Sequence, residues 1–396
     1  MSAGIDDGRL TVYEIGARNG ASHFAQSYCR IPDSFKADVS TIFFEPDETA
    51  VGQIEQRNDA AFTRVLPICL GEYDGSGTFY VNYDPYTSSL LKPAHDFEFT
   101  IADTTDYLFR EVFSPVRELQ MNVCTIDRLV REGLPSPTVL FLDTQGTELE
   151  IIRGGKSAVD EHTVAILTEA EFVQFYEGQS LFGDLCRELA TMGFVFVEFI
   201  GPLGSLDPFR VPFGFRNKTF AGYCDALFLR IPKTLSRNSS LLARLAFVAH
   251  CFGQTAFAFE CMSILERIDP NLSAVPRERV FGRFLCDLAA ASKSMVHFFP
   301  PTFVDLYPTP EASAARFVVG EEAYVASIEE RSRDHMRQQV RERLDDVRRL
   351  LDLSPSPIED VLLQYGFTER SKELCERRIS ETMRMLASLG IRVNRV

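Results

Sequence analysis

The sequence predicts an α/β fold, with a mainly parallel sheet covered by helices on both faces, followed by an all-α region. Between residue 10 and about residue 232, short apolar runs alternate with stretches of helical periodicity, which is typical of a parallel sheet with helical crossovers. After Pro232 the strand pattern stops and long helical patterns take its place. We therefore expect an α/β domain over residues 1–235 and an α-helical domain over residues 236–396.

Strands are predicted where a short apolar or β-branched run ends at a turn-forming residue or an acid. By this criterion the strands of the first domain are 10–15, 41–44, 64–70, 138–143, 163–169, 194–200 and 225–231. Two further runs are expected to form additional arms, 78–82 after the DGSG turn at 74–77, and 119–124.

Helices are predicted from apolar residues that recur every three or four positions and from residues that can cap a helix. In the first domain these signals place helices at 22–29, 125–131 and 181–192. A further helix is expected just after the strand at 138–143, with Glu148 in its first turn. In the second domain we expect helices at 240–268, 277–296, 312–351, 357–365 and 368–389.

Composition and charge argue against several classes of protein. The chain has 396 residues, 45% hydrophobic and 24% charged, which is typical of a globular protein, and its most apolar stretches are too polar for a membrane span. Residues 236–396 hold 22 acidic and 22 basic side chains, so the first domain carries the whole net charge of −15. Because an acidic domain repels phosphate backbones, a nucleic-acid substrate is not expected. The nine cysteines form no CxxC pair and the chain begins without a signal-like leader, so we expect a cytoplasmic protein.

The first predicted strand runs into a glycine turn, the segment EIGARNG at residues 14–20. Its two glycines are four residues apart, and glycines let a backbone approach a ligand closely. The spacing is not GxGxxG, which argues against a dinucleotide site. Glu14 can hold an amino group of a ligand in this arrangement, or the segment can be an ordinary strand-to-helix turn.

The next strands also end in residues that suit a nucleoside. Glu45 and Pro46 follow the second strand, where a carboxylate can accept hydrogen bonds from both hydroxyls of a ribose, or can simply begin a helix. Cys69 and Leu70 end the third strand, where they can flank an adenine ring or mark a turn. Ser88 and Ser89 lie in the hydroxyl-rich segment YTSSLL at 86–91, which can line a polar pocket or form a serine-rich turn.

The segment LDTQGTE at residues 142–148 combines the end of a buried strand, an acid, a glycine and the start of a helix. Ligands of open α/β sheets bind at the carboxyl ends of the strands. Asp143 is therefore our candidate for a base or for a residue that orients an acceptor, with a purely structural role as the alternative. Glu148 stands in the first turn of the helix, where a carboxylate stabilises the helix dipole.

Taken in order, EIGARNG at 14–20, FEP at 44–46 and LDTQGTE at 142–148 resemble the FkbM family of S-adenosylmethionine-dependent methyltransferases. The resemblance extends over about residues 10–230, with supporting pieces at 88–90, 125–129, 152–155 and 169–178. It implies a class I, Rossmann-like fold and methyl transfer to a hydroxyl oxygen. By the resemblance, Glu14 and Gly16 lie at the methionine end of the cofactor, Glu45 at its ribose and Asp143 at the transferred methyl. Arg18 is a departure, because the family usually has Asn at this position.

The predicted site follows from the motifs together with this resemblance. Residues expected to bind S-adenosylmethionine are Glu14, Gly16, Ala17, Asn19, Gly20, Glu45, Pro46, Cys69, Leu70, Asp143 and Gln145. Asp143 is also the expected catalytic residue, and the residues expected to bind the acceptor are Ser88, Ser89, Glu148, Glu169 and Glu171. Asp143, Glu169 and Glu171 could in principle hold a hard cation, but we expect no metal because each acid has a simpler explanation.

We expect an O-methyltransferase whose acceptor is a sugar, a glycan or a polyketide-like natural product. Two rivals stay open: a methyltransferase with a nitrogen or carboxylate acceptor, and a non-catalytic methyltransferase-like binding module. The expected partner is the small-molecule or glycan acceptor, with no nucleic acid. Residues 236–396 can serve as a lid, a docking surface or a homodimer contact, and two-fold dimers are the commonest oligomers.

Overall fold

The computed structural model describes residues 9–16, 18, 38–58, 63–94, 100–101, 109–207, 220–268, 270–271, 280–292 and 330. The chain forms two compact units, residues 1–286 and 287–396. Every described helix and strand lies in the first unit, except that helix α9 (Val280–Ser292) crosses its end. The helices predicted at 22–29, 357–365 and 368–389, and nearly all of the helix at 312–351, lie outside the described residues.

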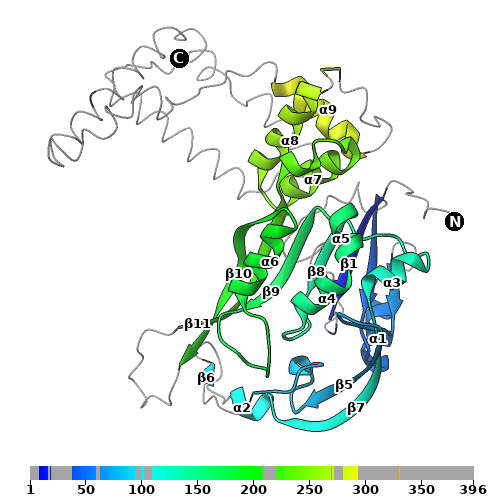
Figure 1. Ribbon diagram of the computed structural model, residues 1–396, viewed down its shortest axis with the longest axis vertical. Coiled ribbons are helices and arrows are strands. Elements are labelled where there is room, and N and C mark those ends of the chain that lie inside the picture. Colours follow the sequence, from blue (N-terminus) through cyan, green and yellow to red (C-terminus); the bar gives the residue numbers. More distant parts are fainter. Residues whose placement is uncertain are drawn as a thin grey trace. The chain divides into compact units, whose positions relative to one another are not determined.

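The centre of the first unit is an eight-stranded sheet (Figure 1). Its strands, in spatial order, are β3 (Thr63–Leu66), β2 (Val39–Phe44), β1 (Leu10–Ile15), β8 (Val139–Leu142), β9 (Ala165–Glu171), β11 (Phe220–Arg230), β10 (Phe194–Asp207) and β6 (Thr100–Ile101). Neighbours from β3 to β9 are parallel, whereas β11 runs antiparallel to β9 and β10, and β6 antiparallel to β10. The predicted α/β fold with a mainly parallel sheet is therefore confirmed.

Strands β1 and β8 are the most deeply buried part of the sheet. Every residue of both is buried, as expected for strands covered on two faces, which read as continuous apolar runs. Ile15 pairs with Phe44 of β2 on one side and with Leu142 of β8 on the other, so these three strands end at the same edge. This register brings the residues that follow them, including Glu45 and Asp143, to one place.

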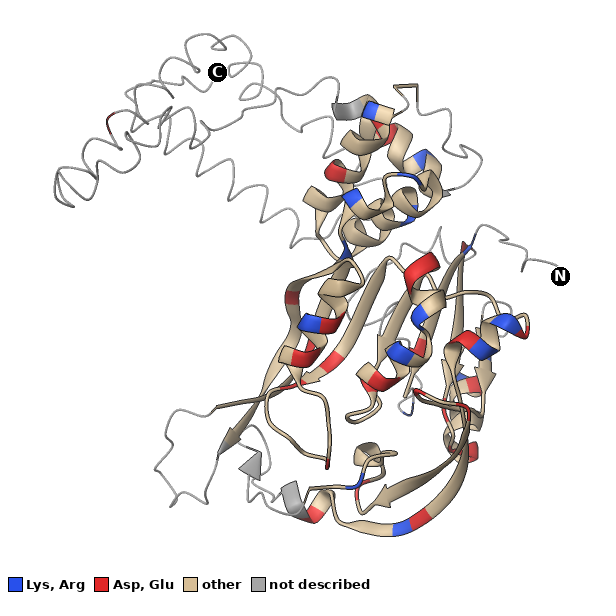
Figure 2. Ribbon diagram, in the orientation of Figure 1, with Lys and Arg blue, Asp and Glu red and all other residues tan. Residues whose placement is uncertain are grey.

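Helices cover both faces of the sheet. Helices α3 (Ile126–Arg131), α4 (Glu148–Gly154), α5 (Lys156–His162) and α6 (Phe182–Thr191) bury apolar side chains against one face. Helix α1 (Glu48–Arg57) packs Ile54 against Phe43 on the other. The sequence did not predict α1, although Asp47 caps it by accepting a hydrogen bond from the Thr49 amide at 2.8 Å. Acidic and basic side chains are mixed along these helices (Figure 2).

A second, three-stranded sheet has the order β4 (Cys69–Leu70), β7 (Pro115–Cys124) and β5 (Gly75–Asn82). The arms predicted at 78–82 and 119–124 are parts of β5 and β7. The single strand predicted at 64–70 is wrong, because its two halves, β3 and β4, belong to different sheets. Pro67 lies between them and cannot donate a ladder hydrogen bond, so the chain turns there. Between β5 and β7 lie the short helices η3 (Pro85–Thr87) and α2 (Phe109–Val112).

After β11 and the short helix η4 (Pro232–Leu235), the elements that the structure describes are helices, as predicted for this part of the chain. The single helix expected at 240–268 is instead two, α7 (Ser239–Cys251) and α8 (Thr255–Ile268). Gly253 breaks them apart with φ +77°, a conformation typical of the residue that follows a helix. The first compact unit includes α7 and α8 and so extends past residue 235, and the functional division at residue 235 stays a prediction. Among the described residues, no helix has both the length and the apolar character needed to cross a membrane.

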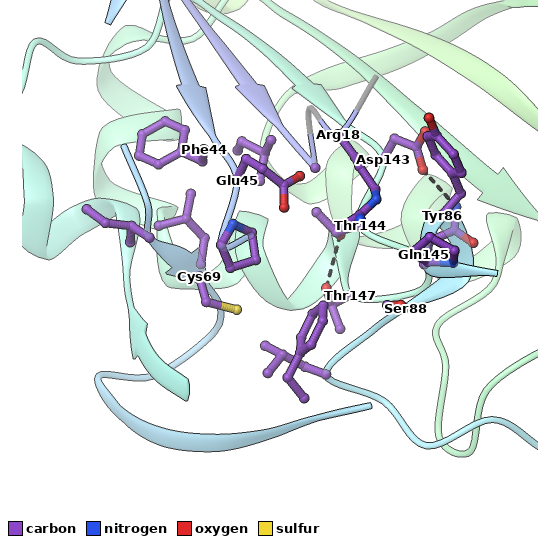
Figure 3. Close-up of a pocket in the computed structure, with 18 residues that line it drawn as sticks. Arg18, Phe44, Glu45, Cys69, Tyr86, Ser88, Asp143, Thr144, Gln145 and Thr147 are labelled. Carbon is purple, nitrogen blue, oxygen red and sulfur yellow. Dashed lines mark hydrogen bonds between the residues drawn. The ribbon is translucent and has the colours of Figure 1, made fainter. Parts of the chain in front are cut away.

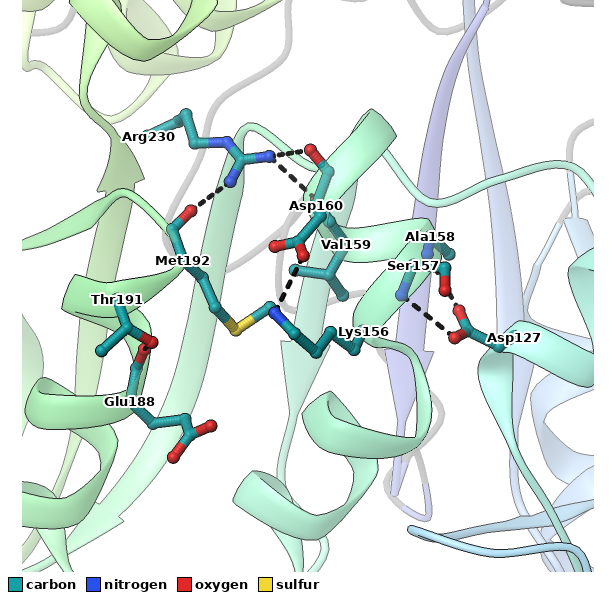
Figure 4. Close-up of polar contacts among 10 residues, drawn as sticks. All are labelled: Asp127, Lys156, Ser157, Ala158, Val159, Asp160, Glu188, Thr191, Met192 and Arg230. Carbon is teal, nitrogen blue, oxygen red and sulfur yellow. Dashed lines mark hydrogen bonds and ion pairs between the residues drawn. The ribbon is translucent and has the colours of Figure 1, made fainter.

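Polar contacts fix the ends of α5 and α6 (Figure 4). Buried Arg230, at the end of β11, donates to the backbone carbonyls of Met192, Val159 and Asp160, and its guanidinium lies 4.6 Å from the ring centre of Phe194. These carbonyls belong to the last turns of two helices, where a cation is favourable. Arg230 thereby ties the C-terminal ends of α5 and α6 to β11.

Candidate active site

The site begins with a close contact between the ends of β1 and β8. Gly16 follows β1 with φ +82°, and a Cβ atom there would overlap the backbone carbonyl oxygen of Asp143. The Gly16 amide donates to the Phe44 carbonyl at 3.1 Å, and the Asp143 amide donates to the Ile15 carbonyl at 3.0 Å. Only glycine meets both the backbone conformation and the spacing, so Gly16 is required for this edge to form.

A small pocket opens beside this contact, with a cavity volume of about 70 Å³. In Figure 3, Glu45 and Cys69 lie on one side of it, with Asp143, Gln145 and Tyr86 on the other. The pocket brings together many of the predicted residues: Gly16, Glu45, Pro46, Cys69, Leu70, Ser88, Asp143 and Gln145. It lies at the carboxyl ends of the central strands, where the sequence placed it.

Other predicted residues lie elsewhere. Glu14 is fully buried within β1 and does not line the pocket. Ser89 and the three glutamates expected to bind the acceptor lie next to the lining residues rather than among them. Ala17, Asn19 and Gly20 fall outside the described residues.

The sequence missed about half of the lining. The pocket is also bounded by Ile15, Arg18, Phe44, Ile68, Phe79, Pro85, Tyr86, Leu90, Thr144 and Thr147. Arg18, Thr144 and Thr147 stand inside two of the quoted motifs, and Tyr86 stands beside Ser88, so proximity in sequence was a usable signal for these. Phe79 comes from β5 of the second sheet, and no motif in the sequence pointed to β5 as part of the pocket wall.

Glu45 is buried and its carboxylate is held in place. Its Oε1 accepts a hydrogen bond from the Asp47 amide at 2.9 Å, and its exposed fraction is 4%. Burial raises the pKa of Glu45, while the Asp47 amide and the Arg18 charge act in the opposite direction. With Oε1 oriented by the backbone, Oε2 is the oxygen best placed to accept from a ligand hydroxyl.

Arg18 is the one basic residue among the described residues that line the pocket. Its Nη1 lies 2.8 Å from Asp47 Oδ2, and its guanidinium carbon lies 5.9 Å from the ring centre of Tyr86. Burial would raise the pKa of Asp47, but the Arg18 hydrogen bond and the amides of Thr49 and Ala50 outweigh it and lower that pKa. The residue that departs from the family pattern is therefore part of the wall, next to both Glu45 and an exposed aromatic ring.

Asp143 is oriented by Gln145. Gln145 Nε2 donates to Asp143 Oδ1 at 2.8 Å and to Glu169 Oε2 at 2.7 Å, so one amide group joins two carboxylates. The hydroxyl of Tyr176, 3.2 Å from Gln145 Oε1, fixes which way the amide points, and Ser89 donates to the Gln145 carbonyl at 2.8 Å. Gln145 has φ +60°, an unfavourable conformation for a residue other than glycine, which is typical of functional sites.

Glu148 holds the loop between β8 and α4. Its Oε1 accepts from the Thr144 amide at 2.7 Å, the Thr144 hydroxyl at 3.0 Å and the Gly146 amide at 3.2 Å. Burial raises the pKa of Glu148 to about 7, although these amides act against the rise. Glu148 was expected to stabilise the start of α4. It has a second role as well, because its carboxylate shapes the turn that carries Asp143 and Gln145.

Glu148, Glu169 and Glu171 form a cluster, which we call the glutamate cluster. One carboxylate oxygen of each lies within 4.8 Å of the others. Burial raises the pKa of Glu169 and Glu171 well above the usual value, and the charges of neighbouring acids add to this. In the described part of the chain, no lysine or arginine forms an ion pair with the cluster.

The segment that carries this pocket is similar to one known protein family. Residues 14–196 match the family model of the methyltransferase FkbM domain. The matched segment includes every residue that lines the pocket and the whole glutamate cluster. FkbM methyltransferases use S-adenosylmethionine.

Two solved structures are similar to the chain. A methyltransferase FkbM from Methylobacillus flagellatus has 16% identity and a TM-score of 0.31, with 56% of this chain and 44% of that chain covered. The alignment thus spans less than half the length of that protein. A putative RNA methyltransferase from Pyrococcus horikoshii has 11% identity and a TM-score of 0.27, with 57% of this chain and 77% of that chain covered. No curated protein sequence matches the chain.

The glutamate cluster predicts a pH dependence of stability. A carboxyl whose pKa is higher in the folded than in the unfolded chain takes up protons on folding, so its stabilisation is lost as the pH rises toward the folded pKa. The melting temperature of the full chain, measured with a chelator present, should therefore fall between pH 5 and pH 8. Glu171→Gln should reduce that fall by roughly 2 °C or more. The surface variant Glu161→Gln should follow the wild type, and equal slopes for all three proteins would contradict the prediction.

Proposed function

We propose that this chain is an S-adenosylmethionine-dependent O-methyltransferase whose acceptor is a hydroxyl group of a sugar, a glycan or a polyketide-like natural product. The observation that carries the proposal is the convergence of Gly16, Glu45 and Asp143 on one pocket inside the segment that matches the methyltransferase FkbM domain. Ends of three different strands supply these residues, so their meeting depends on the fold and not on one local motif.

The residues of the pocket fit the cofactor. Glu45 presents a buried carboxylate to accept from ribose hydroxyls, and Cys69 and Leu70 supply apolar surface for an adenine ring. Gly16 lines the pocket without a side chain, so its backbone is next to the place proposed for the methionine part. The bound cofactor supplies an activated methyl group on a positively charged sulfur, and the acids around Asp143 favour that charge.

Asp143 is the proposed catalytic residue. It is partly exposed in the pocket, and the Gln145 amide fixes its carboxylate, which leaves Oδ2 free to meet an acceptor hydroxyl. A bound S-adenosylmethionine would supply the methyl group and keep the electron pair of the broken carbon–sulfur bond on its sulfur. Asp143 would accept the proton of the acceptor hydroxyl as the oxygen takes the methyl group. Positioning of the hydroxyl supplies much of the rate in such a displacement.

Charge favours a hydroxyl over an anionic acceptor. Asp143 lines this end of the pocket, where its carboxylate can accept a hydrogen bond from a hydroxyl group but repels carboxylates and phosphates. A carboxylate acceptor and a nucleic acid are therefore disfavoured, whereas a nitrogen acceptor stays as the alternative. The orientation of Asp143 by Gln145 argues against a non-catalytic binding module, because a protein that only binds its ligand would not need an oriented carboxylate.

The helical region is proposed to contribute a dimer contact, a lid or a docking surface. The described cysteines are free thiols, which supports the cytoplasmic location predicted from sequence.

Cofactor binding depends on Glu45. In calorimetry the wild-type chain should bind S-adenosylmethionine, and Glu45→Ala should weaken the affinity at least about tenfold, because the ribose loses a charged acceptor. Glu48→Ala, an exposed acid three residues away, should bind like the wild type. A wild-type chain that does not bind S-adenosylmethionine would overturn the proposed function.

Turnover depends on Asp143. Transfer of labelled methyl from S-adenosylmethionine to a panel of hydroxylated sugars and polyketides should identify an acceptor. On that acceptor, Asp143→Asn should lower kcat at least about 100-fold because the proton acceptor is lost. Its affinity for S-adenosylmethionine should change less than about threefold, and Asp160→Asn on the surface of α5 should retain wild-type turnover. Unchanged turnover in Asp143→Asn would make Asp143 a structural residue.

A further inference from the structure

The glutamate cluster joins two elements that are distant in sequence. Glu169 and Glu171 are two residues apart on β9, so their side chains point to the same face of the sheet. Glu148 is the first residue of α4. One oxygen from each of the three lies within 4.8 Å of the others, with Glu148 and Glu171 each only 2% exposed. Three carboxylates are thus gathered in a site that is open to solvent mainly at Glu169.

The hydrogen bonds of the cluster leave oxygens without a protein partner. The bonds from Thr144 and Gly146 all end on Glu148 Oε1, and the bond from Gln145 ends on Glu169 Oε2. Glu171 Oε2 is buried and accepts no well-formed hydrogen bond within the described residues. The Gln179 side chain lies nearby and acts against the rise in the pKa of Glu171 that burial causes. A buried carboxylate oxygen of this kind needs a partner, because the loss of hydration is otherwise uncompensated.

A cation satisfies this requirement better than the protein does. Hard divalent cations prefer carboxylate oxygens, and calcium–oxygen distances of about 2.3–2.6 Å place ligands on opposite sides of the ion about 5 Å apart. The observed separation of at most 4.8 Å fits such an ion with little movement, and Mg²⁺ or Mn²⁺ with a small contraction. An ion would also offset most of the charge of three neighbouring acids.

We propose that Glu148, Glu169 and Glu171 bind a hard divalent cation of the class Mg²⁺, Mn²⁺ or Ca²⁺. The sequence led us to expect no metal, and the cation set it considered contained Asp143 instead of Glu148. The structure favours Glu148 over Asp143 as the third ligand. Asp143 lines the pocket and its Oδ1 accepts a hydrogen bond from Gln145, whereas Glu148 lies beside Glu169 and Glu171. Three protein ligands leave coordination positions open for water or for hydroxyl oxygens.

Gln145 connects this site to the pocket. Its amide contacts both Asp143, which lines the pocket, and Glu169, which belongs to the cluster. A cation that draws Glu169 toward Glu171 and Glu148 therefore acts on the residue that orients Asp143. This role of the cation rests on the proposed function, whereas the binding of the cation does not.

Metal titration of the chelator-treated full chain tests the proposal. Separate titrations with Mg²⁺, Mn²⁺ and Ca²⁺ should show which ion binds, through a rise in melting temperature and, for Mn²⁺, through loss of the free-ion electron paramagnetic resonance signal. Glu171→Gln and Glu169→Gln should each weaken the preferred ion by at least about tenfold, since ligand charge sets affinity in such sites. Glu161→Gln is the matched control and should bind like the wild type.

Two results would overturn the proposal: no response of the wild type to any of the three ions, or an equal response in the cluster variants. In either case the carboxylates would share protons instead. Glu171→Gln is a fair test because it removes a charge without removing volume, and circular dichroism verifies its fold. Calorimetry with S-adenosylmethionine in the presence of a chelator separates the methyltransferase proposal from the cation proposal. If the cofactor binds without metal, the methyltransferase proposal stands whatever the metal titrations show.

Discussion

The contact between Gly16 and the backbone carbonyl of Asp143 is the constraint on which the rest of the site depends. Because Gly16 has no Cβ and adopts φ +82°, the turn after β1 can lie directly against the end of β8. The parallel register then places Glu45, at the end of β2, beside both. A pocket with a carboxylate on each side follows from this packing, and the proposed function assigns the cofactor to Glu45 and the acceptor to Asp143.

The site retains unfavourable features that the fold could have avoided. Gln145 has a left-handed backbone conformation, Glu171 has a buried oxygen without a well-formed hydrogen bond, and three glutamates share a small volume. Each costs stability, and such costs persist where function requires them. The hydrogen bonds from Ser89 and Tyr176 to Gln145 show how the surroundings hold that conformation. The proposed cation would relieve the electrostatic part of the cost.

Local sequence patterns predicted the parts of the structure that local physics determines. Continuous apolar runs identified β1 and β8, and the acids that end β2 and β8 identified Glu45 and Asp143 as pocket residues. The ends of helices and strands depend on single residues and were predicted less accurately. Pro67 divides a predicted strand, and Gly253 divides a predicted helix. The glutamate cluster was out of reach, because the approach of Glu148 to β9 depends on tertiary packing, as does the cation–π contact of Arg18 with Tyr86.

Cofactor binding by Gly16→Ala tests the central claim most directly. The added methyl group would overlap the Asp143 carbonyl, and the alanine itself would have to adopt a positive φ. The two strand ends must therefore separate. Gly52→Ala is the control, since Gly52 lies in α1 with open space around it. We predict that Gly16→Ala loses at least about tenfold in affinity for S-adenosylmethionine, an effect of about 1.4 kcal/mol, while Gly52→Ala binds like the wild type. Wild-type affinity in Gly16→Ala would contradict the account.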